Sequence, residues 1–207
     1  MRLRHNARFA WQKVMGARLA RDFLDKCEHY KNICADVRLM LSDAMLQERR
    51  IRVEVRPINT DAVCDSHAWH QAARHVNWDW EQIRRKLFTY GPRTLSLAFY
   101  AGYPDKPRLC GLVAAQVSPH ARWLSLTHLE GSPEPGHPLK GLVLPMAMLG
   151  LSLFKTQVST EETARRIGLR VLNPLPDALD CYCRSGYTDF VREKNLSYIV
   201  VQPPAEA

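Results

Sequence analysis

The chain has 207 residues, of which 46% are hydrophobic, and its 29 Lys and Arg against 21 Asp and Glu give a net charge of +8. This composition excludes an intrinsically disordered chain, and no apolar run reaches the length of a membrane span. A basic balance favours polyanionic partners, namely nucleic acid, an anionic membrane or a phosphate-rich cofactor. Because no signal-peptide core follows the basic N-terminus, we expect a cytoplasmic protein that does not bind a membrane.

The cysteines and histidines give no sign of a metal site. No C-x-x-C pair occurs, and Cys181 and Cys183 would point to different faces of a helix. The spacing of His67, His70 and His75 selects no metal either. We therefore predict no metal ion and, without a secretion signal, reduced thiols.

Residues 1–50 are predicted to be helical, because apolar residues recur near the helical spacing from Phe9 and again from Tyr30. We interpret them as two helices that form an N-terminal extension, with the main domain at 51–207. Two roles stay open. The extension packs on the main domain or on a second copy, giving a homodimer, or it is a basic arm on nucleic acid. The arm would use Arg2, Arg4, Arg8, Lys13, Arg18 and Arg21, and the interleaved Asp22, Asp25 and Glu28 count against it.

At Ile51 the pattern changes to a strict alternation that ends at Pro57 and predicts a strand. Hairpin-like apolar runs and turn residues continue along the chain. Together they predict an α/β or α+β sheet with helices on both faces. Further strands are expected at 94–100, 109–117, 123–129, 169–172, 190–191 and 198–201, and further helices at 139–154, 160–168 and 177–185.

Two helices are expected between the first strand and the second. Asp65-Ser66 is predicted to cap a helix that carries Ala68, Trp69, Ala72 and Ala73. Asn77 or Asp79 opens the next helix, from Trp80 to Leu87. On that helix we expect the run Arg84-Arg85-Lys86 to be a solvated face.

The segment from His128 to Val143 is typical of a strand, a turn and a helix start. His128-Leu129-Glu130 ends the strand, and Gly136-His137-Pro138-Leu139-Lys140-Gly141 opens an apolar helix. The free backbone N–H groups and the positive dipole end of such a helix start attract an anion. The segment therefore favours a cofactor that carries phosphate.

A second motif runs from Asn173 to Tyr187, where Ala178, Tyr182 and Gly186 recur at intervals of four. With the order of elements, it resembles the GCN5-related N-acetyltransferase (GNAT) superfamily. The resemblance covers about residues 51–201 in order and 126–187 in motif, and residues 1–50 lie outside it. It implies a mixed, mostly antiparallel central sheet flanked by helices, with an N-terminal helical extension.

The resemblance implies acetyl-CoA as co-substrate, with its pyrophosphate on the backbone of Leu139 to Val143. Gly141 takes the central glycine position of the family's loop, while Pro138 and Val143 depart from its flanking residues. The pantetheine arm would lie between the strand that ends at Glu130 and the strand before Asn173. The implied cofactor-binding residues are Leu129, Leu139, Lys140, Gly141, Leu142, Val143 and Asn173.

The implied chemistry is the transfer of an acetyl group to a primary amine. Tyr182 takes the position of the general acid for the leaving thiolate, and Glu130 that of a general base, acting directly or through water. His128, on the same strand face, is a second candidate for the base, after Glu130, and is assigned to the substrate site. Trp78 and Trp80 are assigned to the same site, because they lie in the region that covers the acceptor.

Two functions follow as hypotheses. The first is an acetyl-CoA-dependent N-acetyltransferase whose acceptor is a small amine, a peptide amine or an aminoacyl-tRNA. The second is a catalytically inactive domain of the same fold, which would use the basic N-terminal helices to hold nucleic acid or a protein. The departures in the pyrophosphate loop and residues 1–50 favour the second hypothesis, and Tyr182, Asn173 and Glu130 favour the first.

Overall fold

The computed structural model describes the backbone of residues 3–69, 78–89, 91–103, 105–161 and 167–203, and the side chains from residue 21 onward except at 88, 160 and 161. Its centre is a seven-stranded sheet in the order β1-β2-β3-β4-β5-β7-β6. Neighbouring strands are antiparallel except β4 and β5, which are parallel. The prediction of a mixed, mostly antiparallel sheet is confirmed. The strands are β1 (Val53–Arg56), β2 (Thr94–Tyr103), β3 (Lys106–Val117), β4 (Trp123–Gly131), β5 (Gly168–Leu172), β6 (Asp189–Glu193) and β7 (Leu196–Gln202).

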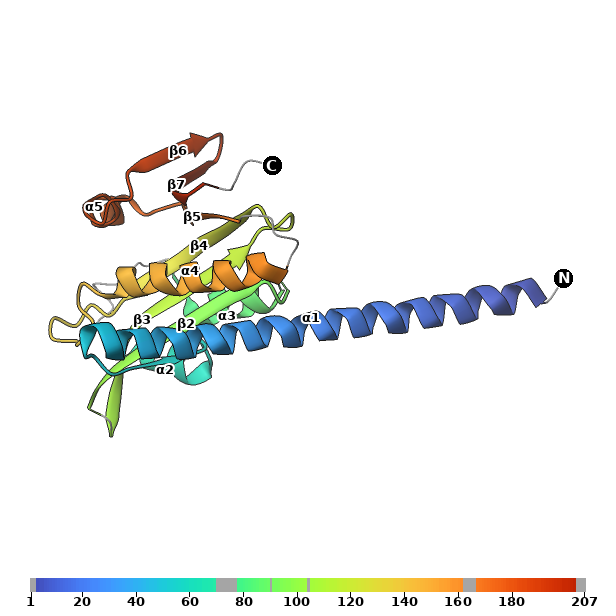
Figure 1. Ribbon diagram of the computed structural model, residues 1–207, viewed down its shortest axis with the longest axis horizontal. Helices are drawn as coiled ribbons and strands as arrows, with labels where there is room; N and C mark the ends of the chain where they lie inside the picture. The colour runs from blue at the N-terminus through green and yellow to red at the C-terminus, as the bar shows by residue number, and fades with distance from the viewer. Residues whose placement is uncertain (1–2, 70–77, 90, 104, 162–166, 204–207) are drawn as a thin grey trace.

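Helices cover both faces of the sheet, so the molecule has three layers (Figure 1). α1 and α4 lie on one face, and α2 and α3 lie on the other. No helix within the described ranges is both long and apolar enough to cross a membrane. The helices are α1 (Leu3–Arg49), α2 (Thr60–His67), α3 (Trp80–Thr89), α4 (Val143–Glu161), the 3-10 turn η2 (Pro176–Ala178) and α5 (Leu179–Arg184).

α1 is one continuous helix of 47 residues, so the prediction of two helices is wrong. The stretch has no proline, and its single interior glycine, Gly16, weakens a helix by only about 1 kcal/mol. The first half of α1 extends past the sheet, whereas the second half lies along α4 (Figure 1). That second half buries Tyr30, Ile33, Val37, Leu41 and Met45 in the same core as the sheet. The division of the chain at residue 50 stays a prediction.

The core on the α1 and α4 face is tightly packed around Gly150. A Cβ at this position would lie 2.8 Å from Leu97 Cδ1 and 3.3 Å from Leu41 Cδ2, closer than side chains normally pack. Glycine therefore allows α4 to lie close to both the sheet and α1. Pro145 lies in the first turn of α4, where a missing N–H is tolerated, as the sequence required.

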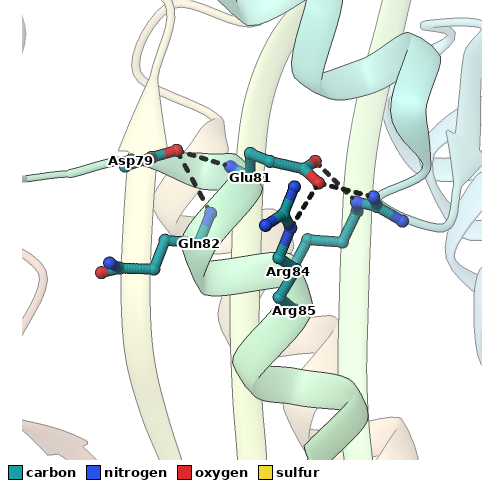
Figure 2. Close-up of polar contacts among 5 residues, drawn as sticks. All are labelled: Asp79, Glu81, Gln82, Arg84 and Arg85. Carbon is teal, nitrogen blue, oxygen red and sulfur yellow. Dashed lines mark hydrogen bonds and ion pairs between the residues drawn. The ribbon is translucent and has the colours of Figure 1, made fainter.

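On the other face, the caps of α2 and α3 fix where these helices begin. α2 is capped by Asn59, whose Oδ1 accepts a hydrogen bond of 2.9 Å from the Ala62 N–H. The predicted cap at Asp65-Ser66 is wrong, because these residues lie in the last turns of α2; positions 72 and 73 lie outside the described residues. α3 is capped by Asp79, as predicted: its Oδ1 accepts from the N–H groups of Glu81 (2.9 Å) and Gln82 (3.2 Å), as Figure 2 shows.

A smaller core joins α2 and α3 to the sheet. Trp80, Ile83 and Leu87 follow one another at helical spacing on α3 and are buried against the sheet. On this face the sheet contributes Leu112 and Ala114 of β3, among others. Because β3 pairs Leu112 with Glu130 and Ala114 with His128, these two residues of β4 share the face on which α3 lies.

Candidate active site

The site is built where β4 and β5 separate. The two strands pair only from Trp123 to Leu126 on β4 and from Gly168 to Val171 on β5. Beyond Leu126, β4 continues to Gly131, while β5 ends after Leu172. The strands therefore leave a slot between them, in the interior of the sheet.

Asn173 bends the chain directly after β5. Its backbone has a positive φ of 45°, a left-handed conformation that Asn tolerates better than most residues. Its N–H donates to Ser197 O at 2.7 Å, and its Oδ1 accepts from Ser197 N at 3.1 Å. Both bonds tie the end of β5 to the start of β7, so this residue helps to hold the slot open.

The slot reaches both faces of the sheet. Ala178 and Tyr182, from η2 and α5, line it on the α4 face, and Trp78 lines it on the α3 face. On the α3 side it meets a cavity of about 410 Å³, with which it shares Trp78, Thr127, His128, Leu172, Asn173 and Leu175. The cavity is completed by Ile83, Lys86, Leu87 and Gln116.

Tyr182 is a buried phenol at the slot. The residue is only 5% exposed, and burial raises the pKa of its hydroxyl to about 12. No hydrogen bond to this hydroxyl is found among the described residues. The backbone is held by the turn after α5, where Tyr187 N donates to Tyr182 O at 3.0 Å. Tyr182 is therefore protonated at neutral pH and keeps a donor for a group in the slot.

Glu130 lies near the end of β4 and is 9% exposed. Its Oε2 accepts a hydrogen bond from the Trp80 indole Nε1, which explains why both residues are buried on the same face. Glu130 is not among the described residues that line the slot or the cavity. The structure therefore brings Glu130 to the expected strand end but covers its carboxylate with Trp80.

His128 lies two residues before Glu130 on β4 and lines both the slot and the cavity. Its ring packs edge-on against Trp78, with ring centres 5.4 Å apart, and against Trp80, with ring centres 6.2 Å apart. Burial and, to a smaller extent, the charge of Lys86 lower the pKa of His128 to about 4, so the imidazole is neutral at pH 7.

The tautomer of His128 follows from its neighbour Thr127. The Thr127 hydroxyl donates to Ala114 O at 2.9 Å, so its oxygen is left to accept at 3.1 Å from His128 Nδ1. Nδ1 therefore carries the proton of the neutral ring. Nε2 is left as a hydrogen-bond acceptor on a residue that lines both the slot and the cavity.

The loop before α4 presents free backbone donors at the start of that helix. The Lys140 and Leu142 N–H groups are engaged by His137 O and Leu139 O. In the described part of the chain, the N–H groups of Gly141, Val143 and Leu144 donate no hydrogen bond. These donors lie at the N-terminus of a 19-residue helix, whose dipole adds to them.

Two glycines shape this loop. Gly141 is exposed with a φ of 78°, and nothing lies within 4 Å of where a Cβ would be. Gly111 of β3 has the opposite property, since a Cβ there would lie 2.7 Å from Val143 Cγ1. Gly111 thus lets the first turn of α4 lie on the sheet. Gly141 leaves open space beside the free N–H groups at the start of α4. Leu139 anchors the loop with a fully buried side chain, and the Lys140 side chain is exposed.

The mixed, mostly antiparallel sheet and the separation of β4 and β5 agree with what the resemblance to the GNAT superfamily implies. No protein-family model and no curated protein matches the chain. The chain is similar to a solved acetyltransferase from Thermus thermophilus, at 15% identity and a TM-score of 0.45, over 74% of this chain and 97% of that one.

Two further solved structures are similar. One is the PaiA N-acetyltransferase from Thermoplasma acidophilum in complex with coenzyme A, at 12% identity and a TM-score of 0.47, over 72% of this chain and 98% of that one. The other is a domain from Methanocaldococcus jannaschii, at 10% identity and a TM-score of 0.49, over 73% and 99%.

Sequence reasoning missed several residues of the site. Lys86, assigned to a solvated helix face, also lines the cavity. Thr127, Gln116 and Leu144 carried no motif. The adjacency of Thr127 to His128 was a signal for a hydrogen bond, but the bulge in β4 that makes it is a tertiary feature. Of the predicted residues, Trp78, His128, Leu129, Asn173 and Tyr182 line one slot, whereas Trp80 does not line it and packs against Trp78.

Proposed function

We propose that this chain is a GNAT enzyme that transfers the acetyl group of acetyl-CoA to a primary amine. The observation that carries the proposal is the slot between β4 and β5. A protonated tyrosine, Tyr182, lines it on one face of the sheet, and a neutral imidazole, His128, lines it on the other. Such a slot allows a thioester to be reached by an acid and by an amine from opposite sides.

The loop before α4 fits a pyrophosphate. Gly141, Val143 and Leu144 offer free N–H groups at a helix N-terminus, and the open space around Gly141 admits a bulky anion. The exposed Lys140 would add a positive charge. Leu129 and Asn173, on the two sides of the slot, would flank the pantetheine arm.

Bound acetyl-CoA supplies a thioester whose carbonyl carbon forms a bond to the amine nitrogen as its bond to sulfur breaks. We propose that Tyr182 donates its proton to the leaving sulfur and regains one from solvent. A general acid of this kind contributes about a hundredfold to ten-thousandfold in rate. The raised pKa of Tyr182, about 12, keeps the proton available over the whole neutral range.

The amine must lose a proton in the same reaction, and we propose Glu130 as its final acceptor. Because the Glu130 carboxylate is covered by Trp80, the proton would pass through a water molecule. His128 would orient the amine through its Nε2 acceptor, with Thr127 fixing the tautomer. Trp78, which lines the cavity, would hold the apolar part of the acceptor, and Trp80, which is buried, would support the Trp78 ring.

Thermal unfolding with and without acetyl-CoA is the first test. A ligand at a hundred times its Kd stabilises the folded state by about 2.7 kcal/mol, so we expect a clear rise in Tm. Release of free thiol with a panel of primary amines tests turnover. No rise in Tm would contradict the cofactor site. A rise in Tm without turnover of any amine would favour the catalytically inactive domain.

A further inference from the structure

We propose that the acceptor is a small amine that also carries an anionic group, and that Lys86 binds this group. The inference rests on the proposed function, because it names the substrate class of the same site. The observation behind it is the charge of the cavity on the α3 face. Among the described residues that line this cavity and the slot, one side chain is cationic and none is a carboxylate.

The absence of a carboxylate separates this cavity from one built for a simple cationic amine. An ammonium group is usually held by Asp, Glu or an aromatic cage. Here the ionisable side chains at the slot and the cavity are Lys86, His128 and Tyr182, within the part of the chain that the structure describes. His128 and Tyr182 are both neutral at pH 7, because burial holds their pKa values at about 4 and about 12. Lys86 therefore sets the charge of the cavity.

Among the described residues, the neighbouring cations Arg84 and Arg85 are paired and Lys86 is not. Arg84 forms a two-pronged contact with Glu81, with N–O distances of 2.8 and 3.0 Å, and Arg85 Nε donates to the same carboxylate at 2.9 Å. Figure 2 shows both guanidinium groups directed at Glu81. The Lys86 ammonium forms no ion pair with any described residue, and its side chain lines the cavity one turn after Ile83. It is therefore free to bind an anion.

The size and walls of the cavity limit the ligand. A volume of about 410 Å³ lies at the lower end of the range for small-molecule sites. Trp78, Ile83, Leu87 and Leu175 make the walls apolar, while Gln116 adds an amide. An amine with a carboxylate at one end and an aliphatic or aromatic side chain, such as a free amino acid, matches this set of groups. A carboxylate on Lys86 would also offset the repulsion that an incoming ammonium meets there.

The test compares ligands that differ only in the anionic group. Binding of N-acetylated amino acids with aliphatic and aromatic side chains is measured by Trp fluorescence against that of the matching N-acetyl amides. These mimic the product and need no turnover. A hydrogen bond between charged groups changes affinity by about tenfold to a hundredfold, so we expect that preference for the acids. Lys86→Met should abolish it, Lys86→Arg should keep most of it, and Arg85→Met, the matched control on the same helix, should leave it unchanged.

The same pairs are tested as acceptors, each amino acid against the amine that lacks its carboxylate. For the acids, Lys86→Met should raise KM and change kcat little, because the Lys86 contact binds the substrate and the transition state alike and takes no part in the proton transfers. Equal binding of acids and amides, binding of neither, or a preference that survives Lys86→Met would overturn the proposal. If the preference is found and no amine is ever acetylated, the proposed enzymatic function fails while the assignment of Lys86 stands.

Discussion

The two faces of the sheet differ in how they close around the same slot. On the α1 and α4 face the core is closely packed, and Val37, Leu41 and Phe154 are fully buried. Tyr182 lines the slot from this face. On the α3 face a smaller core leaves a cavity with Lys86 and Gln116 at its walls. The site thus joins an apolar wall to a polar opening.

This difference explains how one slot could bind two substrates, acetyl-CoA and an amine. The apolar wall raises the pKa of a phenol and keeps it as a donor, which suits protonation of a leaving thiolate. The open α3 face admits the amine substrate. It also exposes hydrogen-bond acceptors to that substrate, such as Nε2 of His128. The predictions below disturb one face at a time.

The largest effect is expected on the apolar face. Tyr182→Phe keeps the ring and its packing but removes the donor, so turnover should fall by about a hundredfold to ten-thousandfold. The affinity for acetyl-CoA should stay near that of the wild type. Because the pKa of Tyr182 is about 12, wild-type turnover should show no loss of this acid up to about pH 10. Steady-state rates and calorimetry measure these quantities, and wild-type turnover in the variant would remove Tyr182 from the mechanism.

The packing of the same face is tested by Leu41→Ala. Leu41 is fully buried between α1, α4 and the sheet, and its loss should lower the free energy of unfolding by about 2–5 kcal/mol. Leu46→Ala is the matched control, because Leu46 lies on the same helix with 46% of its surface exposed. Its effect should stay within about 0.5 kcal/mol in urea unfolding. Equal effects of the two variants would mean that the second half of α1 does not pack on the domain.

On the α3 face, Glu130→Gln removes the proposed proton acceptor while its amide oxygen can still accept from Trp80. Turnover should fall by about a hundredfold, the lower end for general-base loss, because the water relay is indirect. The loss should be greatest at low pH, where the amine is mostly protonated. A pH–rate profile that is lowered by the same factor at every pH would argue for a structural role of Glu130.

Gly141→Asp tests the loop between β4 and α4, directly before the first turn of α4. A negative side chain beside the free N–H groups should weaken acetyl-CoA binding by about tenfold to a hundredfold, the value of a charged hydrogen bond. Gly136→Asp places the same charge at another exposed glycine of the loop with open space around it, and should leave the affinity unchanged. Unchanged affinity in Gly141→Asp would place the pyrophosphate elsewhere.

The smallest effect concerns the titration of His128. Burial lowers its pKa from 6.5 to about 4, so the unfolded chain binds this proton at a higher pH than the folded protein does. The resulting stability is complete above pH 6.5 and is lost as the pH falls towards 4, with a slope of at most about 1.4 kcal/mol per pH unit. Urea unfolding of His128→Asn should show a flatter decline across this window. A slope identical to the wild type would mean that the imidazole is solvated.

The sequence by itself determined most of the elements. Alternation predicted β1, and apolar runs between turn residues predicted the later strands. Asp79 predicted the start of α3, and the spacing of Ala178, Tyr182 and Gly186 pointed to two residues that line the slot, Ala178 and Tyr182. These signals are local, because helix caps and side-chain periodicity depend on neighbours within a few residues. The prediction of two helices failed for α1, because it followed the two apolar runs, although no proline and only one glycine interrupt the stretch.

Only the tertiary structure decided which groups meet at the site. The cover of Trp80 over Glu130, the bond from Thr127 to His128 and the place of Lys86 in the cavity all depend on α3 lying against β4. Residues 86 and 128 are distant in the sequence, so no periodicity or motif relates them. Burial then sets their chemistry, since the pKa of His128 falls because α3 removes water from it.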